Sequence, residues 1–192
     1  MIKAIIFDCF GVLCSDGWLP FRDKYFGSDL ELLEQARDLN RSVDAGITKY
    51  DDFIKKVAEM AGVDEAEAKN DIESNIPDNA LFNYISEKLK DKYKIGMLSN
   101  AAKNWLGDIF LNEQIALFDA IALSYETGVI KPNVGAYQII ATKLGILPNE
   151  CIFIDDQPKY CEGASNAGMV AIHYNNLDQM KMDLSRLIDE KL

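Results

Sequence analysis

Acidic, hydroxyl and lysine side chains follow several short apolar runs of this 192-residue chain. Asp8 follows the run at 2–7, Ser99 and Asn100 follow the run at 95–98, and Asp155 and Asp156 follow the run at 151–154. Lys131 lies a few residues after the run at 120–123. Carboxylate oxygens are the ligands that hard divalent cations such as Mg²⁺ prefer, and a lysine ammonium is a compact positive charge that neutralises anions. Brought together, these side chains can hold a cation and an anionic ligand at one place.

The apolar runs are typical of strands in a buried parallel sheet. Together with a fifth run at 170–173, they are rich in Ile, Val, Leu, Met and Phe and do not alternate strictly with polar residues. Helical patterns lie between them, at 81–90, 101–111, 134–144, 159–167 and 177–190. This alternation predicts an α/β fold with a parallel sheet. Because ligands bind at the carboxyl ends of such strands, we expect the side chains above to line one site.

The stretch 15–79 breaks the alternation, because it contains no convincing strand. Apolar residues have helical spacing at 30–43 and 50–61, a shorter helical pattern covers 64–72, and the proline at 77 marks a break. We interpret residues 15–79 as a small all-helical cap domain. Residues 1–14 and 80–192 then form the α/β core, with helices on both faces of the parallel sheet.

Composition narrows the range of partners. The chain has 31 acidic and 20 basic residues, and this net charge of −11 argues against nucleic acid as a partner. No apolar run approaches the ~18 residues that span a bilayer, and an acid interrupts the first run too early for a signal peptide. The four cysteines lack the Cys-x-x-Cys spacing of metal sites. We therefore expect a cytoplasmic protein with reduced thiols and no membrane partner, and no feature indicates an oligomeric state.

The motifs resemble, in order and spacing, those of the haloacid dehalogenase (HAD) superfamily. FDCFGVL at 7–13 resembles the first motif, LSN at 98–100 the second, KP at 131–132 the third, and FIDD at 153–156 the fourth. The likeness extends from residue 1 to about residue 174. It implies a hydrolase with a Rossmann-like core, of the phosphatase-like branch that carries a helical cap after the first strand.

The resemblance also assigns a role to each residue. Asp8 would attack phosphorus and form an aspartyl-phosphate, which splits one displacement into two steps. Ser99, Asn100 and Lys131 would bind the phosphoryl group of a small phosphorylated metabolite, and Ser99 and Lys131 would also assist catalysis. Mg²⁺ would be the cofactor, with its ligands from Asp8, the backbone carbonyl of Phe10, Asp155 and Asp156.

Position 10 departs from the phosphatase pattern. The phosphatases of this superfamily usually carry a second Asp two residues after the nucleophile, which protonates the leaving group and later activates water. Phe10 stands there and can transfer no proton, although such help is worth about 10²–10⁴-fold in rate. Ser15 and Asp16, at the start of the insert, are candidates to replace it.

Two other functions stay open. The superfamily's 2-haloacid dehalogenases also have an aromatic residue at this position, displace halide from carbon and need no metal. Asp155 and Asp156 argue against that branch, because without a cation two acids would repel a carboxylate substrate. The second alternative is a catalytically weak or idle protein that binds a phosphorylated ligand. The joint presence of four site residues argues against it, namely Asp8, Ser99, Lys131 and Asp155.

Overall fold

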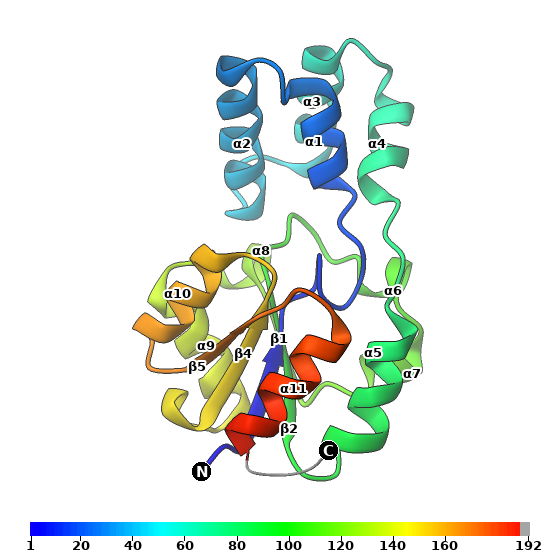
Figure 1. Cartoon of the computed structure of the whole chain (residues 1–192). Coiled ribbons are helices and arrows are strands. Elements are labelled where there is room, and N and C mark those ends of the chain that lie inside the picture. Colours follow the sequence, from blue (N-terminus) through cyan, green and yellow to red (C-terminus); the bar gives the residue numbers. More distant parts are fainter. Residues whose placement is uncertain (189–192) are drawn as a thin grey trace.

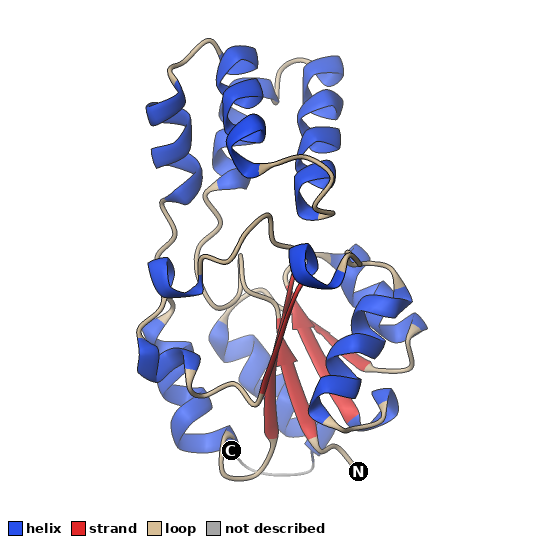
Figure 2. Cartoon of the chain, turned by 180° about the vertical axis from the view of Figure 1, so that it is seen from behind, coloured by secondary structure: helices blue, strands red, loops and turns tan. Residues whose placement is uncertain are grey.

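A computed structural model describes residues 1–188 of the chain. Its centre is a five-stranded parallel sheet with the strand order β3-β2-β1-β4-β5 (Figures 1 and 2). The strands are β1 (Ala4–Phe7), β2 (Lys94–Ser99), β3 (Ala120–Leu123), β4 (Cys151–Asp155) and β5 (Val170–His173). The predicted α/β fold is confirmed, and each strand lies where an apolar run predicted it.

Helices cover both faces of the sheet, which gives three layers. Helices α9 (Val134–Leu144) and α10 (Pro158–Asn166) pack on one face. Helix α5 (Asn79–Tyr84), the π-helical turn η1 (Ile85–Leu89) and α11 (Leu177–Ile188) pack on the other (Figure 1). The residues of β1 contribute alternately to the two apolar clusters, and all four are fully buried. Burial on both faces is the reason that the strands read as continuous apolar runs.

The register of the central strands positions the ends that carry polar residues. Phe7 of β1 pairs with Met97 of β2 and with Ile154 of β4. Asp8 and Asp155 therefore lie at the same level, and Ser99 lies one residue further along β2. The order β2-β1-β4 thus brings three of the predicted side chains to adjacent positions on one edge.

Residues 15–79 form helices that stand beyond the carboxyl edge of the sheet (Figure 1). They are α1 (Trp18–Phe26), α2 (Leu30–Asp44), α3 (Tyr50–Ala61) and α4 (Glu65–Glu73). These helices pack around an apolar cluster of their own that includes Phe21, Phe53 and Val57. The two connecting segments run side by side, since Ser15 N–H donates to the Ile76 carbonyl at 2.9 Å and Asp78 N–H to the Leu13 carbonyl at 2.9 Å.

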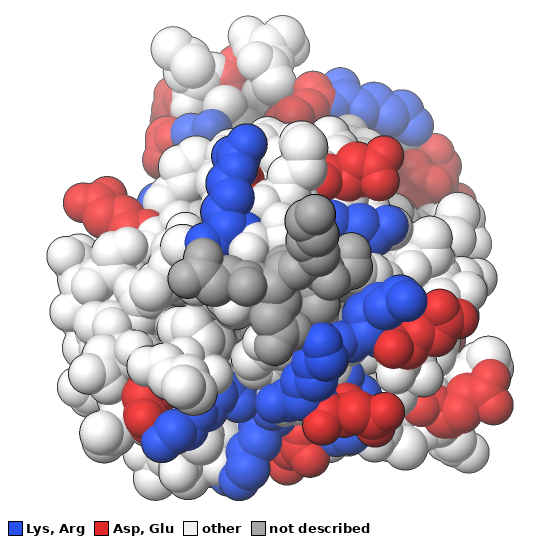
Figure 3. All heavy atoms as spheres, turned by 60° about the horizontal axis from the view of Figure 1, so that its bottom comes forward, with Lys and Arg blue, Asp and Glu red and all other residues white. Residues whose placement is uncertain are grey.

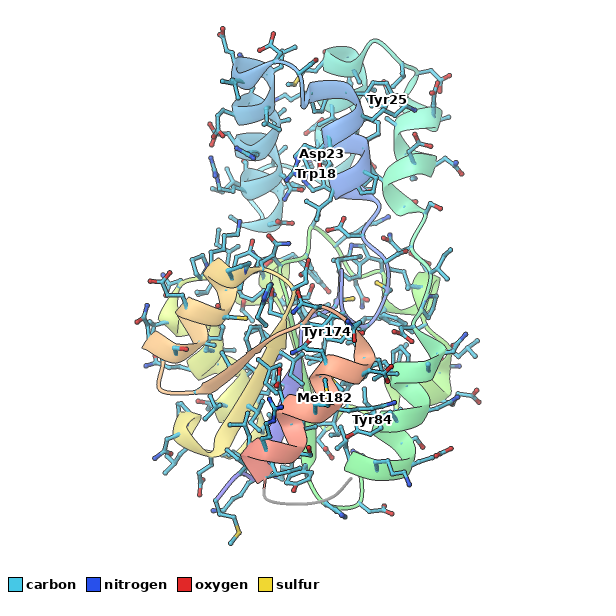
Figure 4. All side chains as sticks on the ribbon, in the orientation of Figure 1. Trp18, Asp23, Tyr25, Tyr84, Tyr174 and Met182 are labelled. Atoms are coloured by element: carbon cyan, nitrogen blue, oxygen red, sulfur yellow. The ribbon has the colours of Figure 1, made fainter. Side chains whose placement is uncertain are left out.

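Helix α1 was not predicted from the sequence. It holds several aromatic residues and Pro20, and its apolar residues do not keep to one helical face. Proline is tolerated there because the first turn of a helix has no intrahelical partner for its N–H groups. Trp18 lies at the end of α1 nearer the core and Tyr25 at the far end (Figure 4).

The prediction of one helix at 101–111 is wrong. The chain from 101 to 105 is a loop, followed by the short helices α6 (Leu106–Ile109) and α7 (Asn112–Ile115). Ser124 Oγ accepts a hydrogen bond from Ala101 N–H at 2.8 Å, and Asn104 Oδ1 accepts one from Leu106 N–H at 3.1 Å. These side-chain bonds satisfy backbone donors outside a helix. The loop follows the carboxyl end of β2 almost directly.

Other elements differ from prediction in detail. The helix predicted at 81–90 divides into α5 and η1, and the short helices α8 (Ser124–Thr127) and η2 (Pro148–Glu150) were not predicted. The last two residues of the helix predicted at 177–190 lie outside the described residues.

Within residues 1–188, no helix is both long enough and apolar enough to cross a bilayer.

The end of the molecule opposite the helical bundle shows a mixed surface. On this face, Lys and Arg side chains lie among Asp and Glu side chains (Figure 3). Closer to the middle of the molecule, Tyr84 of α5 and Met182 of α11 lie where these two helices are neighbours (Figure 4).

Candidate active site

A buried lysine joins two acids at the carboxyl edge of the sheet. Lys131 Nζ lies 2.7 Å from Asp8 Oδ1 and 2.6 Å from Asp155 Oδ2. The three residues are 2%, 5% and 0% exposed, respectively, so water screens these charges little. The structure thus brings together residues that are far apart in sequence.

Backbone and amide groups hold these side chains in place. Asp8 N–H donates to the Ile154 carbonyl at 2.9 Å, and Asp8 Oδ1 accepts from Cys9 N–H at 2.7 Å. Asp155 Oδ1 accepts from Gln157 N–H at 2.8 Å. These contacts fix both carboxylates at the ends of their strands, with Lys131 between them.

Asn100 acts on the backbone of Lys131. Its Oδ1 accepts from Lys131 N–H at 2.8 Å, and its Nδ2 donates to the Lys131 carbonyl at 3.2 Å. The Lys131 ammonium also lies 4.6 Å from the ring centroid of Tyr160. Ser99, at the end of β2, is 1% exposed and lines the same cavity as Asp8.

Asp156 adds a third carboxylate. Oxygen atoms of Asp8, Asp155 and Asp156 all lie within 4.8 Å of one another, a spacing that can hold a metal ion. Gly11 makes room for this group, because a Cβ at Gly11 would lie 2.7 Å from the carboxyl of Asp156. Gly11 also has a φ of +82°, which other residues rarely adopt.

The cluster carries more negative than positive charge. Burial raises the pKa of Asp8 well above its ordinary value, and the charge of Asp155 raises it further. Burial also raises the pKa of Asp156. Burial alone would lower the pKa of Lys131, but the charges of Asp155 and Asp8 raise it, so this ammonium stays protonated. Three carboxylates around one ammonium favour a further cation.

A cavity of about 580 Å³ opens above this cluster, between the sheet edge and the helical bundle. Asp8, Ser99, Asn100, Lys131 and Asp156 contribute to its wall. Phe10 does so too, and its ring packs edge-on against Trp105 with the centroids 4.3 Å apart. Phe10 is thus part of an apolar pair at the cavity wall, and its side chain can transfer no proton.

The candidates to replace that acid differ in their placement. Ser15 is exposed, and its hydroxyl accepts from Ile76 N–H at 2.8 Å. Asp16 lines the cavity and accepts from Leu19 N–H at 3.1 Å, at the start of α1. Only Asp16 of this pair is among the cavity residues.

Sequence reasoning missed several residues of the cavity wall, among them Asp44, Trp105 and Tyr160. None belongs to a motif, and Trp105 lies in the loop that was predicted as helix. A signal for Asp44 was available, because it directly follows the predicted helix 30–43. An acid at a helix C-terminus is unfavourable and therefore calls for an explanation.

Comparison with known proteins supports the same reading of the fold and motifs. Residues 2–168 match the family model of the haloacid dehalogenase-like hydrolases. The chain is 28% identical over 194 residues to a phosphatase of Mycobacterium tuberculosis, Phosphatase MT3486, covering 88% of this chain and 86% of that protein.

Two solved structures share the fold. The HAD family enzyme BT-2542 of Bacteroides thetaiotaomicron, in complex with magnesium and inorganic phosphate, has a TM-score of 0.70 at 24% identity, covering 91% of this chain and 95% of that one. The L-2-haloacid dehalogenase of Xanthobacter autotrophicus, with chloropropionic acid covalently bound, has a TM-score of 0.68 at 20% identity, covering 98% and 83%. With four motifs in order on a parallel sheet and a family model matched over residues 2–168, the chain belongs to the haloacid dehalogenase-like hydrolases.

Proposed function

We propose that this hydrolase is a Mg²⁺-dependent phosphatase of small phosphate monoesters that forms an aspartyl-phosphate on Asp8. The observation that carries the proposal is the cluster of Asp8, Asp155 and Asp156 beside Lys131, next to a cavity that Asp8, Asp156 and Lys131 line. The phosphatase relative and the magnesium and phosphate complex of BT-2542 support it.

The residues present fit Mg²⁺. The carboxylates of Asp8, Asp155 and Asp156 offer hard oxygen donors in close proximity, and their charge exceeds that of the single ammonium. The Phe10 carbonyl is the fourth proposed ligand. When bound, Mg²⁺ supplies positive charge between the Asp8 carboxylate and an anionic phosphate, which otherwise repel each other.

Each residue of the cluster has a proposed role in the reaction. A carboxylate oxygen of Asp8 attacks phosphorus, a bond from Asp8 to phosphorus forms, and the ester P–O bond breaks. Ser99 donates a hydrogen bond to a phosphoryl oxygen, and Lys131 neutralises charge on Asp8 and on the phosphate. Asn100 places Lys131 by holding its backbone. Water then cleaves the aspartyl-phosphate and releases inorganic phosphate.

The helical bundle is the proposed cap, with boundaries at 15 and 79. The paired connecting segments support these boundaries, because the chain leaves and re-enters the core at one place. Trp18 and Tyr50 of the bundle line the cavity. We infer that such residues select the group attached to the phosphate.

The metal-independent dehalogenase is the weaker alternative. The shared fold does not separate the two activities, since both solved structures resemble this chain to a similar extent. The third carboxylate favours the phosphatase, because Asp156 increases the repulsion of a carboxylate substrate in the absence of a cation.

The test is turnover of p-nitrophenyl phosphate and a panel of phosphate esters, with Mg²⁺ and with excess chelator. We expect phosphate release that needs Mg²⁺. Halide release from 2-chloropropionate that persists in chelator would establish the dehalogenase instead. Binding of inorganic phosphate without turnover of any ester would establish an idle ligand-binding protein.

Gly11→Ala is expected to raise the Mg²⁺ concentration for half-maximal activity by about 10–100-fold. The added methyl group would collide with the Asp156 carboxyl and displace a proposed ligand. Gly62→Ala is the matched control, since Gly62 has a φ of +70° and open space around its Cβ position. Titration of activity with Mg²⁺ measures the effect, and an equal shift in both variants would attribute it to backbone strain.

A further inference from the structure

The cavity contains a carboxyl group that can take over the proton transfer missing at Phe10. We propose that Asp44, the last residue of α2, is the general acid that protonates the leaving group and the general base that later activates water. The inference rests on the proposed phosphatase function and deepens it. It assigns to the helical bundle a catalytic step that motif spacing would place in the loop after β1.

Asp44 is anchored above the reactive edge. Its side chain lines the cavity that also contains Asp8, Ser99 and Lys131. Ser124 Oγ, at the start of α8, donates to the backbone carbonyl of Asp44, while the same oxygen accepts from Ala101 N–H at 2.8 Å. The end of α2 is thereby tied to the loop that follows Ser99. A carboxyl held in this way keeps a defined position relative to the sheet edge.

The surroundings of Asp44 favour its neutral form. Burial, followed by the charge of Asp16, raises the pKa of Asp44 to about 7. Its place at the C-terminus of α2 acts in the same direction, because the last carbonyl groups of a helix disfavour a negative charge. An acid whose pKa lies near the working pH is suited to general acid-base catalysis.

Other groups around Asp44 limit this shift. Lys131 before α9 and Lys159 of α10 face it and lower its pKa, as does the hydrogen bond that Asn40 Nδ2 donates to Asp44 Oδ2 at 3.0 Å. Tyr160 of α10 also faces Asp44. Burial raises the pKa of that phenol to about 12, and the charge of Asp44 contributes to the rise. Asp44 can therefore titrate near neutrality, while Tyr160 stays neutral.

Asp16 is the charged neighbour of Asp44. Burial raises the pKa of Asp16 above its ordinary value, and the hydrogen bonds that Leu19 N–H and Trp18 N–H donate to its carboxylate limit this rise. The N-terminus of α1 favours a negative charge, whereas the C-terminus of α2 opposes one. Asp16 thereby supplies the neighbouring negative charge that, after burial, raises the pKa of Asp44.

The proton balance closes over one cycle. As Asp8 attacks and the ester P–O bond breaks, the Asp44 carboxyl gives its proton to the leaving oxygen and becomes a carboxylate. In the second step, water attacks the aspartyl-phosphate and the Asp44 carboxylate takes a proton from that water. Asp8 and inorganic phosphate separate, and Asp44 returns to its protonated form.

The test compares two leaving groups in Asp44→Asn. p-Nitrophenolate leaves without a proton, whereas the alkoxide of glycerol 2-phosphate needs one. We expect kcat/KM for glycerol 2-phosphate to fall by about 10²–10⁴-fold and that for p-nitrophenyl phosphate to fall by less than about tenfold. Equal losses on both substrates, or no loss on either, would overturn the role of Asp44.

The pH profile gives a second measurement. With glycerol 2-phosphate, wild-type kcat/KM should fall as pH rises through about 7, because the acid loses its proton. Asp16→Asn removes the charge that raises the pKa of Asp44 and should move this falling limb to lower pH. An unmoved limb in Asp16→Asn would contradict the coupling of the two carboxyl groups.

Thermal stability provides a measurement independent of turnover. The raised pKa of Asp44 means that its ionisation destabilises the folded state progressively from about pH 4 to pH 7 and fully above pH 7. Asp44→Asn should therefore have a higher Tm than wild type at about pH 8, and the difference should shrink toward about pH 4. If wild type hydrolyses neither ester, the phosphatase function is refuted. If wild type is active and Asp44→Asn hydrolyses both esters as fast as wild type, only the inference about Asp44 is refuted.

Discussion

Asp8→Asn is expected to lower kcat/KM for p-nitrophenyl phosphate by about 10⁴–10⁶-fold, the range found when a nucleophile is removed. The amide nitrogen and oxygen of Asn cannot form the aspartyl-phosphate. The measurement is release of p-nitrophenolate with saturating Mg²⁺, and mass spectrometry of acid-quenched wild type should detect the phosphorylated Asp8.

The same substitution should leave the fold intact. Asp8 is one of three carboxylates around a single ammonium, and Lys131 keeps its contact with Asp155 when Asp8 becomes neutral. We expect a Tm equal to or above that of wild type in the absence of Mg²⁺, which is the trade-off of stability for activity seen at active sites. Asp91→Asn, at an exposed position outside the cavity wall, is the matched control and should retain activity. Substantial turnover by Asp8→Asn would refute the covalent mechanism.

Lys131→Met is expected to reduce the free energy of unfolding by about 3–5 kcal/mol and to lower kcat/KM by at least ~10²-fold. Lys131 is 2% exposed and contacts both Asp8 and Asp155, so its loss leaves two buried carboxylates facing each other. Urea denaturation at neutral pH measures the first effect, and turnover of p-nitrophenyl phosphate measures the second.

The destabilisation of Lys131→Met should depend on pH. Burial already raises the pKa of Asp8, and removal of the ammonium raises it further, so a modest fall in pH neutralises this carboxyl in the variant. The difference in unfolding free energy from wild type should therefore shrink toward about pH 5. Lys88→Met, at an exposed position, is the control for loss of a lysine. A stable, fully active Lys131→Met would show that the ammonium has neither role.

The replacement of the usual acid by Phe10 changes how the two parts of the molecule depend on each other. The edge-on contact of Phe10 with Trp105 makes part of the cavity wall apolar, whereas the helical bundle contributes carboxyl groups to the same wall, among them that of Asp44 at the end of α2. If Asp44 transfers the proton, the position of the helical bundle controls catalysis as well as substrate choice. The hydrogen bond from Ser124 to the Asp44 carbonyl is then a contact on which activity depends.

The strands and the main residues of the candidate site could be predicted from the sequence. Strands buried on both faces must be apolar throughout, and parallel strands must end at one edge, so the placement of Asp8, Ser99 and Asp155 follows from local pattern and topology. The helical nature of 15–79 also followed from apolar spacing. These features depend on periodicity, which a sequence displays directly.

The rest was decided by tertiary structure. The loop at 101–105 carries a helical pattern, but Ala101 N–H bonds to Ser124 Oγ, a residue more than twenty positions away. Asn100 was predicted to bind phosphate. Only the structure shows that the oxygen and the nitrogen of its side-chain amide both bond to the backbone of Lys131. Asp44 belongs to no motif, and its proposed role depends on where α2 ends relative to the sheet. Such contacts join distant segments, and their energies depend on burial and on neighbouring charges, which exist only once the chain has folded.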